Sequence, residues 1–212
     1  MKKKIFVVGS ALYYASWIEN YEFVENMKDA DVILFTGGED VSPELYGEED
    51  PEDLCFCNSK RDQEEADIFD NVRTDQVCLG ICRGSQFLCV MNGGKLVQDC
   101  ENHAIGYTHG ITNGEYEYDI TSTHHQMQYP YNLDPKHYTL LYKSAGRRSS
   151  YYCGPVDEDE ILKYGEPEIV YYHVPEFPKC LAIQGHPEMM FKDAPVINML
   201  NELLDSILEN NI

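Results

Sequence analysis

The sequence has no run of about 18 apolar residues, so it offers no candidate transmembrane helix. Basic residues are scarce: 16 Lys and Arg stand against 37 Asp and Glu, which gives a formal net charge of −21. A surface this acidic repels phosphate groups and anionic lipids. We therefore expect neither a nucleic-acid partner nor membrane association.

Signals of secretion are also missing. The basic start MKKKIFVVGS has an apolar stretch too short for a signal peptide and fits a first buried strand better. Eight cysteines are scattered through the expected strands and helices, and a chain of 212 residues does not need disulfides to be stable. We therefore expect reduced thiols and a cytoplasmic protein.

Metal-ligand spacing is absent from short stretches of the chain. Cys55 and Cys57 form C-x-C without a second pair nearby, whereas zinc sites use C-x-x-C. His124 and His125 are adjacent, and adjacent residues of a strand point to opposite faces. We expect no metal site and no organic cofactor.

What the chain does contain is an alternation of short apolar runs and amphipathic segments. These predict strands over 4–9, 31–36 and 76–81, and helices over 60–72, 84–94 and 194–211. Between residues 9 and 31 there is room for one helix and, as an alternative, a short strand at YEFV. The alternation predicts an α/β fold with a mostly parallel central sheet and flanking helices.

The residue pattern changes over about residues 95–184, where short strand-like segments replace the alternation of strands and helices. Short strands rich in tyrosine and β-branched residues predict a small antiparallel region, and 146–167 reads as an inserted, charged excursion. We find no repeats and no interdomain linker, so one domain is expected over 1–212.

The segment LGICRGSQ follows an apolar run and places Cys82 between Gly80 and Gly84. Small residues two before and two after a nucleophile allow a strand to turn sharply into a helix with the nucleophile exposed at the apex. The alternative is a buried structural cysteine beside flexible glycines. This stretch alone leaves both readings open.

A thiol nucleophile needs a base, and the base needs an orienting acceptor. The segment QGHPE follows a buried strand, and proline at position 187 favours an extended His186, so His186 and Glu188 project to the same side. Glu188 could then hold the imidazole while its other nitrogen faces Cys82. The alternative is a loop histidine beside a solvated glutamate.

A tetrahedral intermediate also needs hydrogen-bond donors. The N–H of Arg83, at the expected helix start, is one candidate. The segment FTGGEDVSP ends a strand with Gly37 and Gly38, whose backbone could approach a ligand closely. A tight turn that merely uses glycine is the alternative.

Together these segments resemble class I glutamine amidotransferases, and most nearly the γ-glutamyl-γ-aminobutyrate hydrolase-like branch, peptidase family C26. The resemblance covers about residues 31–190 and implies a flavodoxin-like class I glutamine amidotransferase fold, with 1–212 as a single hydrolase domain. Its motifs occur in the family's order: GGEDVSPELYGE, RDQEE, GICRGSQ, NGGKLVQD, STHHQ and QGHPE.

The resemblance assigns roles to the candidate residues. Cys82 would be the nucleophile, His186 the general base and then acid, and Glu188 the residue that orients His186. The oxyanion hole would use one of the two glycines together with the N–H of the residue after the nucleophile: Gly37 or Gly38, with Arg83.

By the same resemblance, Gln86 would contact the glutamyl head group, and the backbone around His124 and His125 would hold the substrate α-carboxylate. Two departures concern the substrate. Gly185 stands where the family has a bulky aromatic residue, which suggests a wider pocket or a looser His186. The excursion at 146–167 has no counterpart that we can place.

The function implied is hydrolysis of a small γ-glutamyl amide through a γ-glutamyl thioester, without a metal or cofactor. One alternative is a glutaminase subunit that delivers ammonia to a partner synthetase. Another is a non-catalytic binding protein on the same fold, since fold alone does not fix function. The expected partner is the small substrate, with a synthetase or a second copy of the chain as further candidates.

Overall fold

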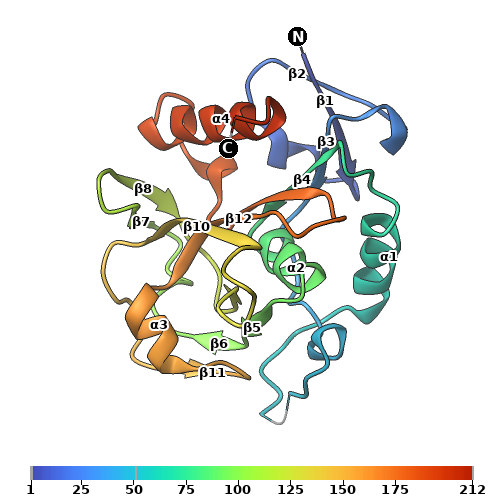
Figure 1. The fold of residues 1–212 in the computed structure, drawn as a ribbon. Coiled ribbons are helices and arrows are strands. Elements are labelled where there is room, and N and C mark those ends of the chain that lie inside the picture. The colour runs from blue at the N-terminus through green and yellow to red at the C-terminus, as the bar shows by residue number, and fades with distance from the viewer. Residues whose placement is uncertain (1, 51, 212) are drawn as a thin grey trace.

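A central sheet of nine strands runs through the computed structural model, which describes residues 2–50 and 52–211 (Figure 1). Its order is β2-β1-β3-β4-β13-β12-β10-β7-β8. The first five strands of this order pair in parallel and the remaining pairs are antiparallel. Its strands are β1 (Lys3–Val8), β2 (Tyr21–Phe23), β3 (Val32–Phe35), β4 (Val77–Ile81), β7 (Thr108–Thr112), β8 (Glu117–Thr121), β10 (Tyr138–Ser144), β12 (Pro167–Tyr172) and β13 (Lys179–Ile183).

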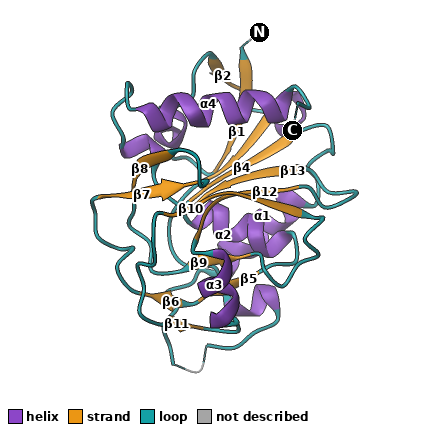
Figure 2. Cartoon of the chain, turned by 60° about the vertical axis from the view of Figure 1, so that its left-hand side comes forward, coloured by secondary structure: helices purple, strands orange, loops and turns teal. Residues whose placement is uncertain are grey.

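Helices cover both faces of this sheet. Figure 2 shows α4 on one face and α1 and α2 on the other. The α-helices are α1 (Ser59–Phe69), α2 (Arg83–Met91), α3 (Glu158–Tyr164) and α4 (Pro195–Leu208). Single 3₁₀ turns lie at η1 (Leu12–Ala15), η2 (Met27–Asp29), η3 (Pro43–Tyr46) and η4 (Pro187–Met189).

The central strands are apolar throughout because both of their faces are buried. In β3, Ile33 and Phe35 belong to the core that contains Phe87 of α2, while Leu34 belongs to the core that contains Leu200 of α4. Successive side chains of a strand point to opposite faces, so one apolar run serves two helical layers. The expected α/β class with a parallel central sheet is confirmed.

The six elements predicted from periodicity all form, and the segment between residues 9 and 31 differs in detail. Its short strand at YEFV is β2, but the expected helix is only the 3₁₀ turn η1. Strand β2 pairs in parallel with β1, so its residues are not available to lengthen the helix before it.

The excursion at 146–167 belongs to a small lobe beside the sheet. Here β11 (Tyr152–Cys153) pairs with β6 (Asp99–Cys100), and β5 (Lys95–Val97) pairs with β9 (Met127–Tyr129). Ile161 of α3 packs into the core of this lobe. The charged appearance of the excursion therefore reflects its exposed side, while its apolar positions close a second, smaller core.

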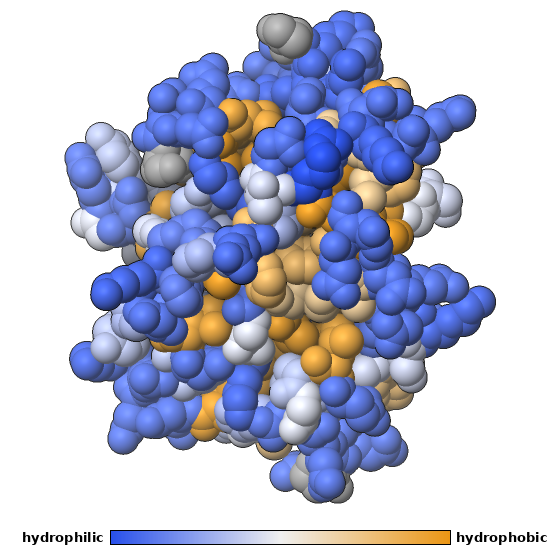
Figure 3. Space-filling model, turned by 45° about the vertical axis from the view of Figure 1, so that its right-hand side comes forward, coloured by the Kyte–Doolittle hydropathy of each residue, from blue (hydrophilic) through white to orange (hydrophobic). Residues whose placement is uncertain are grey.

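Hydrophilic residues predominate on the face shown in Figure 3, with hydrophobic residues visible between them. This surface agrees with the formal net charge of −21. Among the described residues, no helix combines the length and the apolar character that crossing a membrane requires.

Candidate active site

Cys82 lies at the turn between β4 and α2, in a backbone conformation (φ 52°, ψ −111°) that is rare for a residue with a side chain. The two flanking glycines permit this turn. A Cβ atom on Gly80 would lie 2.4 Å from the carbonyl oxygen of Gly84, and one on Gly84 would lie 2.1 Å from the carbonyl oxygen of Phe35. The G-x-C-x-G spacing thus lets α2 pack directly against β3 and β4.

We expect Gly84→Ala to lower the free energy of unfolding by about 1–3 kcal/mol, because the added methyl overpacks a contact between two backbones. It should also lower activity, since α2 must move and Cys82 moves with it. Gly114→Ala is the comparison: its φ of +94° strains an alanine, but no atom lies within 4 Å of the added Cβ, so any loss of stability there should leave activity unchanged. Chemical unfolding and steady-state rates measure both effects. Unchanged activity and stability in Gly84→Ala would contradict this account of the elbow.

His186 and Glu188 form the pair predicted from the QGHPE segment. Nδ1 of His186 lies 2.7 Å from Oε1 of Glu188, and the two side chains are 5% and 1% exposed. Pro187 begins the turn η4 directly after His186, and this turn brings the Glu188 carboxylate back to the His186 ring. Nε2 of His186 lies 2.7 Å from Oγ1 of Thr123, a partner that the sequence pattern did not indicate.

The electrostatics favour a protonated His186. Burial alone lowers its pKa, but hydrogen bonding and negative charge from Cys82 and Glu188 outweigh burial and raise the pKa to about 10. The site therefore favours a proton on the His186 ring while Cys82 and Glu188 carry negative charge. Such a pair supplies both a sulfur nucleophile and a proton for a leaving group.

Gly38 and Arg83 are better placed than Gly37 as candidates for the oxyanion hole. Both line the same cavity as Cys82, whereas Gly37 does not. The Gly37 carbonyl instead accepts a hydrogen bond from Arg61, and Tyr14 lies against the Gly37 Cα. Of the two glycines that the sequence left open, the geometry favours Gly38.

The RDQEE segment supports this loop from α1. Arg61 donates to the carbonyl oxygens of Thr36 and Gly37. The buried Arg83 guanidinium pairs with Asp62 and Glu65, also on α1. Both sides of the candidate oxyanion hole are thereby fixed to one helix, which explains why an acidic and basic segment far from Cys82 belongs to the site.

The three residues assigned to substrate binding also line the cavity, but all three side chains already have hydrogen-bond partners within the protein. Gln86 donates to the carbonyl oxygen of Gln126 at 2.8 Å. His124 is buried, with Nδ1 2.7 Å from the same carbonyl oxygen. His125 lies between Asp40 and Asp99, and its hydrogen bond with Asp40 is the largest effect raising its pKa to about 9.

The cavity itself is small, at about 190 Å³. Its lining joins four separate parts of the chain: Gly38, Asp40, Cys82, Arg83, Gln86, Thr123, His124, His125, Gln126 and His186. The structure therefore brings together every residue assigned from the sequence except Gly37, which lies behind the lining, and Glu188, which reaches the site through His186.

Gly185 does not widen this cavity, contrary to expectation. A Cβ at that position would lie 2.8 Å from Cδ1 of Ile120, so the Ile120 side chain already occupies the space. His186 is also not loose at its backbone, because its N–H donates to the carbonyl oxygen of Thr121 at 2.8 Å. Strand β8 replaces the missing aromatic side chain.

The family model for Peptidase C26 matches residues 8–147, a segment that includes Cys82. The chain belongs to the peptidase C26 family. His186 and Glu188 lie outside the matched segment, so their place in the C26 site rests on the geometry above.

Several curated relatives of this C26 chain carry glutamine amidotransferase-like names. The protein YvdE of Lactococcus lactis, named glutamine amidotransferase-like, is 45% identical over 80 residues, covering 35% of this chain and 34% of that one. Protein NtpR of Enterococcus hirae is 37% identical over 70 residues, covering 32% and 29%. The matched part thus spans about a third of the length of these relatives.

Solved structures share the fold over nearly the whole chain. A GMP synthase subunit from Thermoplasma acidophilum gives a TM-score of 0.60 at 16% identity, covering 100% of this chain and 96% of that one. A glutamine amidotransferase of Thermotoga maritima gives a TM-score of 0.56 at 13% identity, covering 99% and 84%. The class I glutamine amidotransferase fold expected from the sequence is confirmed.

Proposed function

We propose that residues 1–212 form one hydrolase domain that cleaves the γ-glutamyl amide bond of a small γ-glutamyl compound through a thioester on Cys82. One observation carries the proposal: a cysteine on a strained elbow lies in the same cavity as a histidine whose other face is held by a buried carboxylate. That arrangement is the one required for acyl transfer by a thiol.

In the first half of the reaction, Sγ of Cys82 attacks the γ-carbonyl carbon and the carbonyl π electrons move to oxygen. The oxyanion would accept hydrogen bonds from the N–H groups of Gly38 and Arg83, donors at a turn and at a helix start. The tetrahedral intermediate then collapses. Its C–N bond breaks, the amine leaves with the proton of His186, and the thioester remains.

In the second half, neutral His186 takes a proton from water, and the resulting hydroxide equivalent attacks the thioester carbon. The C–S bond breaks, glutamate leaves, and the imidazolium and thiolate are restored. Glu188 keeps the ring oriented in both halves and stabilises each imidazolium. Nε2 of His186, which contacts Oγ1 of Thr123, would also be the ring nitrogen that contacts Sγ of Cys82.

Recognition of the glutamyl group would use the opposite wall of the cavity. The turn between β8 and β9 presents backbone around His124 and His125, which we assign to the α-carboxylate. Asp40 lines the same cavity and offers a carboxylate for the α-ammonium group. The cavity of about 190 Å³ suits a small head group, with the leaving amine directed outward.

A panel of γ-glutamyl amides tests the proposal. We expect the isolated protein to release amine from at least one γ-glutamyl amide, and not from the matching α-glutamyl or β-aspartyl analogues, because the carbonyl must reach Cys82 while both α-groups are bound. Release is measured as free amine and as glutamate in equal amounts.

A protein silent on every amide, glutamine included, contradicts the hydrolase. Strong activation of glutamine cleavage by an added synthetase would instead favour the ammonia-delivering alternative. The synthetase is tested because a GMP synthase subunit shares the fold of this chain.

A further inference from the structure

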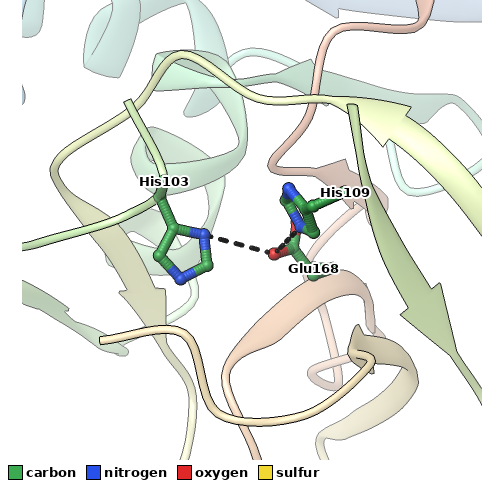
Figure 4. A group of neighbouring side chains, drawn as sticks. All are labelled: His103, His109 and Glu168. Carbon is green, nitrogen blue, oxygen red and sulfur yellow. Dashed lines mark hydrogen bonds and ion pairs between the residues drawn. The ribbon is translucent and has the colours of Figure 1, made fainter. Parts of the chain in front are cut away.

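Three buried side chains from separate parts of the chain converge beside the small lobe. His103 lies in the loop after β6, His109 in β7 and Glu168 in β12 (Figure 4). Nε2 of His109 lies 2.7 Å from Oε1 of Glu168, and Nδ1 of His103 lies 3.5 Å from the same oxygen. One potential ligand atom from each residue lies within 4.8 Å of the others.

The hydrogen bonds among the described residues do not satisfy this cluster. Both ring nitrogens of His103, Nδ1 of His109 and Oε2 of Glu168 are buried without a hydrogen-bond partner. Folded proteins rarely leave several such atoms in one place, because each was hydrated in the unfolded chain. Within residues 2–50 and 52–211, no lysine or arginine pairs with Glu168.

We propose that this cluster binds a divalent transition-metal ion, with Zn²⁺ the ion best suited to it. The ligands would be Nδ1 of His103, Nε2 of His109 and the carboxylate of Glu168, a set of imidazole and carboxylate donors that Zn²⁺ accepts in tetrahedral sites. Tetrahedral bonds of about 2.0–2.2 Å require Nε2 of His109 and Oε1 of Glu168 to move apart from 2.7 Å, and the two ring nitrogens, which lie within 4.8 Å, to close around the ion.

The surroundings supply the support that metal-bound histidines normally have. Oε2 of Glu166 lies 3.4 Å from Nε2 of His103, so a carboxylate faces the ring nitrogen opposite the metal. A carboxylate in that place fixes the ring orientation and makes the histidine a stronger ligand. Glu166 and Glu168 lie two residues apart, which places both on one side of an extended segment.

His124 connects this cluster to the active-site cavity. Its ring lies 4.7 Å from that of His103 between centroids, and its Nε2 is buried without a partner. Because Nδ1 bonds a backbone carbonyl, a neutral His124 carries its lone pair on Nε2, which would become the fourth ligand if its ring moves toward the three clustered atoms. The ion would then fix the turn that faces Cys82, as a structural element and not as a reactant.

Zinc content is the direct test, performed on the full chain with Cys82→Ser so that the active-site thiol cannot hold the metal. We expect roughly one zinc ion per chain after dialysis and a rise in melting temperature with Zn²⁺, because metal binding to a folded site is linked to stability. His109→Gln in the same background should weaken zinc binding at least about 100-fold, beyond the effect of losing a supporting residue. His137→Gln, outside the cluster, is the control and should bind like its parent.

Co²⁺ binding to the Cys82→Ser protein gives a second measurement that does not depend on whether His109→Gln folds correctly. The expected spectrum has the visible bands of tetrahedral cobalt without the charge-transfer band of a cobalt–thiolate bond. Zinc substantially below one ion per chain, equal zinc affinity in His109→Gln and His137→Gln, or a thiolate band would each overturn the proposal. The three side chains would then form a buried hydrogen-bonded cluster without a metal ion.

Discussion

Cys82→Ala should abolish hydrolysis while the protein still folds. Removing the nucleophile of an acyl-transfer triad lowers kcat by about 10⁴- to 10⁶-fold, because the oxyanion donors and substrate binding alone give little turnover. Alanine keeps the Cβ and meets the same backbone strain at φ 52°, so the elbow should survive. Rates on the best γ-glutamyl amide, with a melting curve for each protein, measure the two effects separately.

Cys57→Ala is the matched control for this experiment. Cys57 is exposed and lies outside the cavity lining, so its loss should leave turnover within about twofold, as for most surface substitutions. Cys55 is less suitable, because its sulfur accepts a hydrogen bond from Gln126 at 3.0 Å. A Cys82→Ala protein with nearly unchanged turnover would contradict the thioester mechanism and favour a binding protein on this fold.

Local sequence patterns predicted the sharp turn at Cys82 because the interactions that form it are local. Gly80, Cys82 and Gly84 are within five residues, and the backbone approach they allow follows from the absence of side chains. His186 and Glu188 are likewise separated by a single proline. Where residues near in sequence fix each other's geometry, spacing narrows the possible conformations to the one that the structure shows.

The contacts that the sequence did not reveal join residues far apart in the chain. Thr123 reaches Nε2 of His186 across 63 positions, and Arg83 reaches Asp62 across 21. Nothing in the local pattern of either partner distinguishes it from an ordinary polar residue. Such pairs depend on strand order, which the periodicity of separate elements does not determine.

The same limit explains the outcome at Gly185 and at the buried histidines. The missing aromatic side chain suggested an open pocket, yet Ile120, from an antiparallel strand of unpredicted register, fills the space. Metal-ligand spacing within a short stretch is visible in a sequence, whereas His103, His109 and Glu168 meet only after β7 and β12 take their places in one sheet.

Glu188→Gln should reduce the rate of acylation by about 10- to 10⁴-fold with a smaller effect on substrate binding. The carboxylate acts through His186: it accepts the Nδ1 hydrogen bond at 2.7 Å and stabilises the imidazolium that donates to the leaving amine. A glutamine of the same shape retains packing but removes the charge, and it can present its amide nitrogen to Nδ1 and select the wrong tautomer. Single-turnover release of amine isolates this step from thioester hydrolysis.

The pH dependence of the same variant separates orientation from packing. Glu188 is one of the groups that raise the pKa of His186 to about 10, so removing its charge should lower that pKa. Loss of the proton donor should then occur at lower pH, and the alkaline limb of the acylation profile should move down the pH scale. Glu202→Gln, an exposed change on α4, is the control and should leave rate and profile unchanged. Equal acylation rates in wild type and Glu188→Gln would remove Glu188 from the mechanism and leave Cys82 and His186 as a dyad.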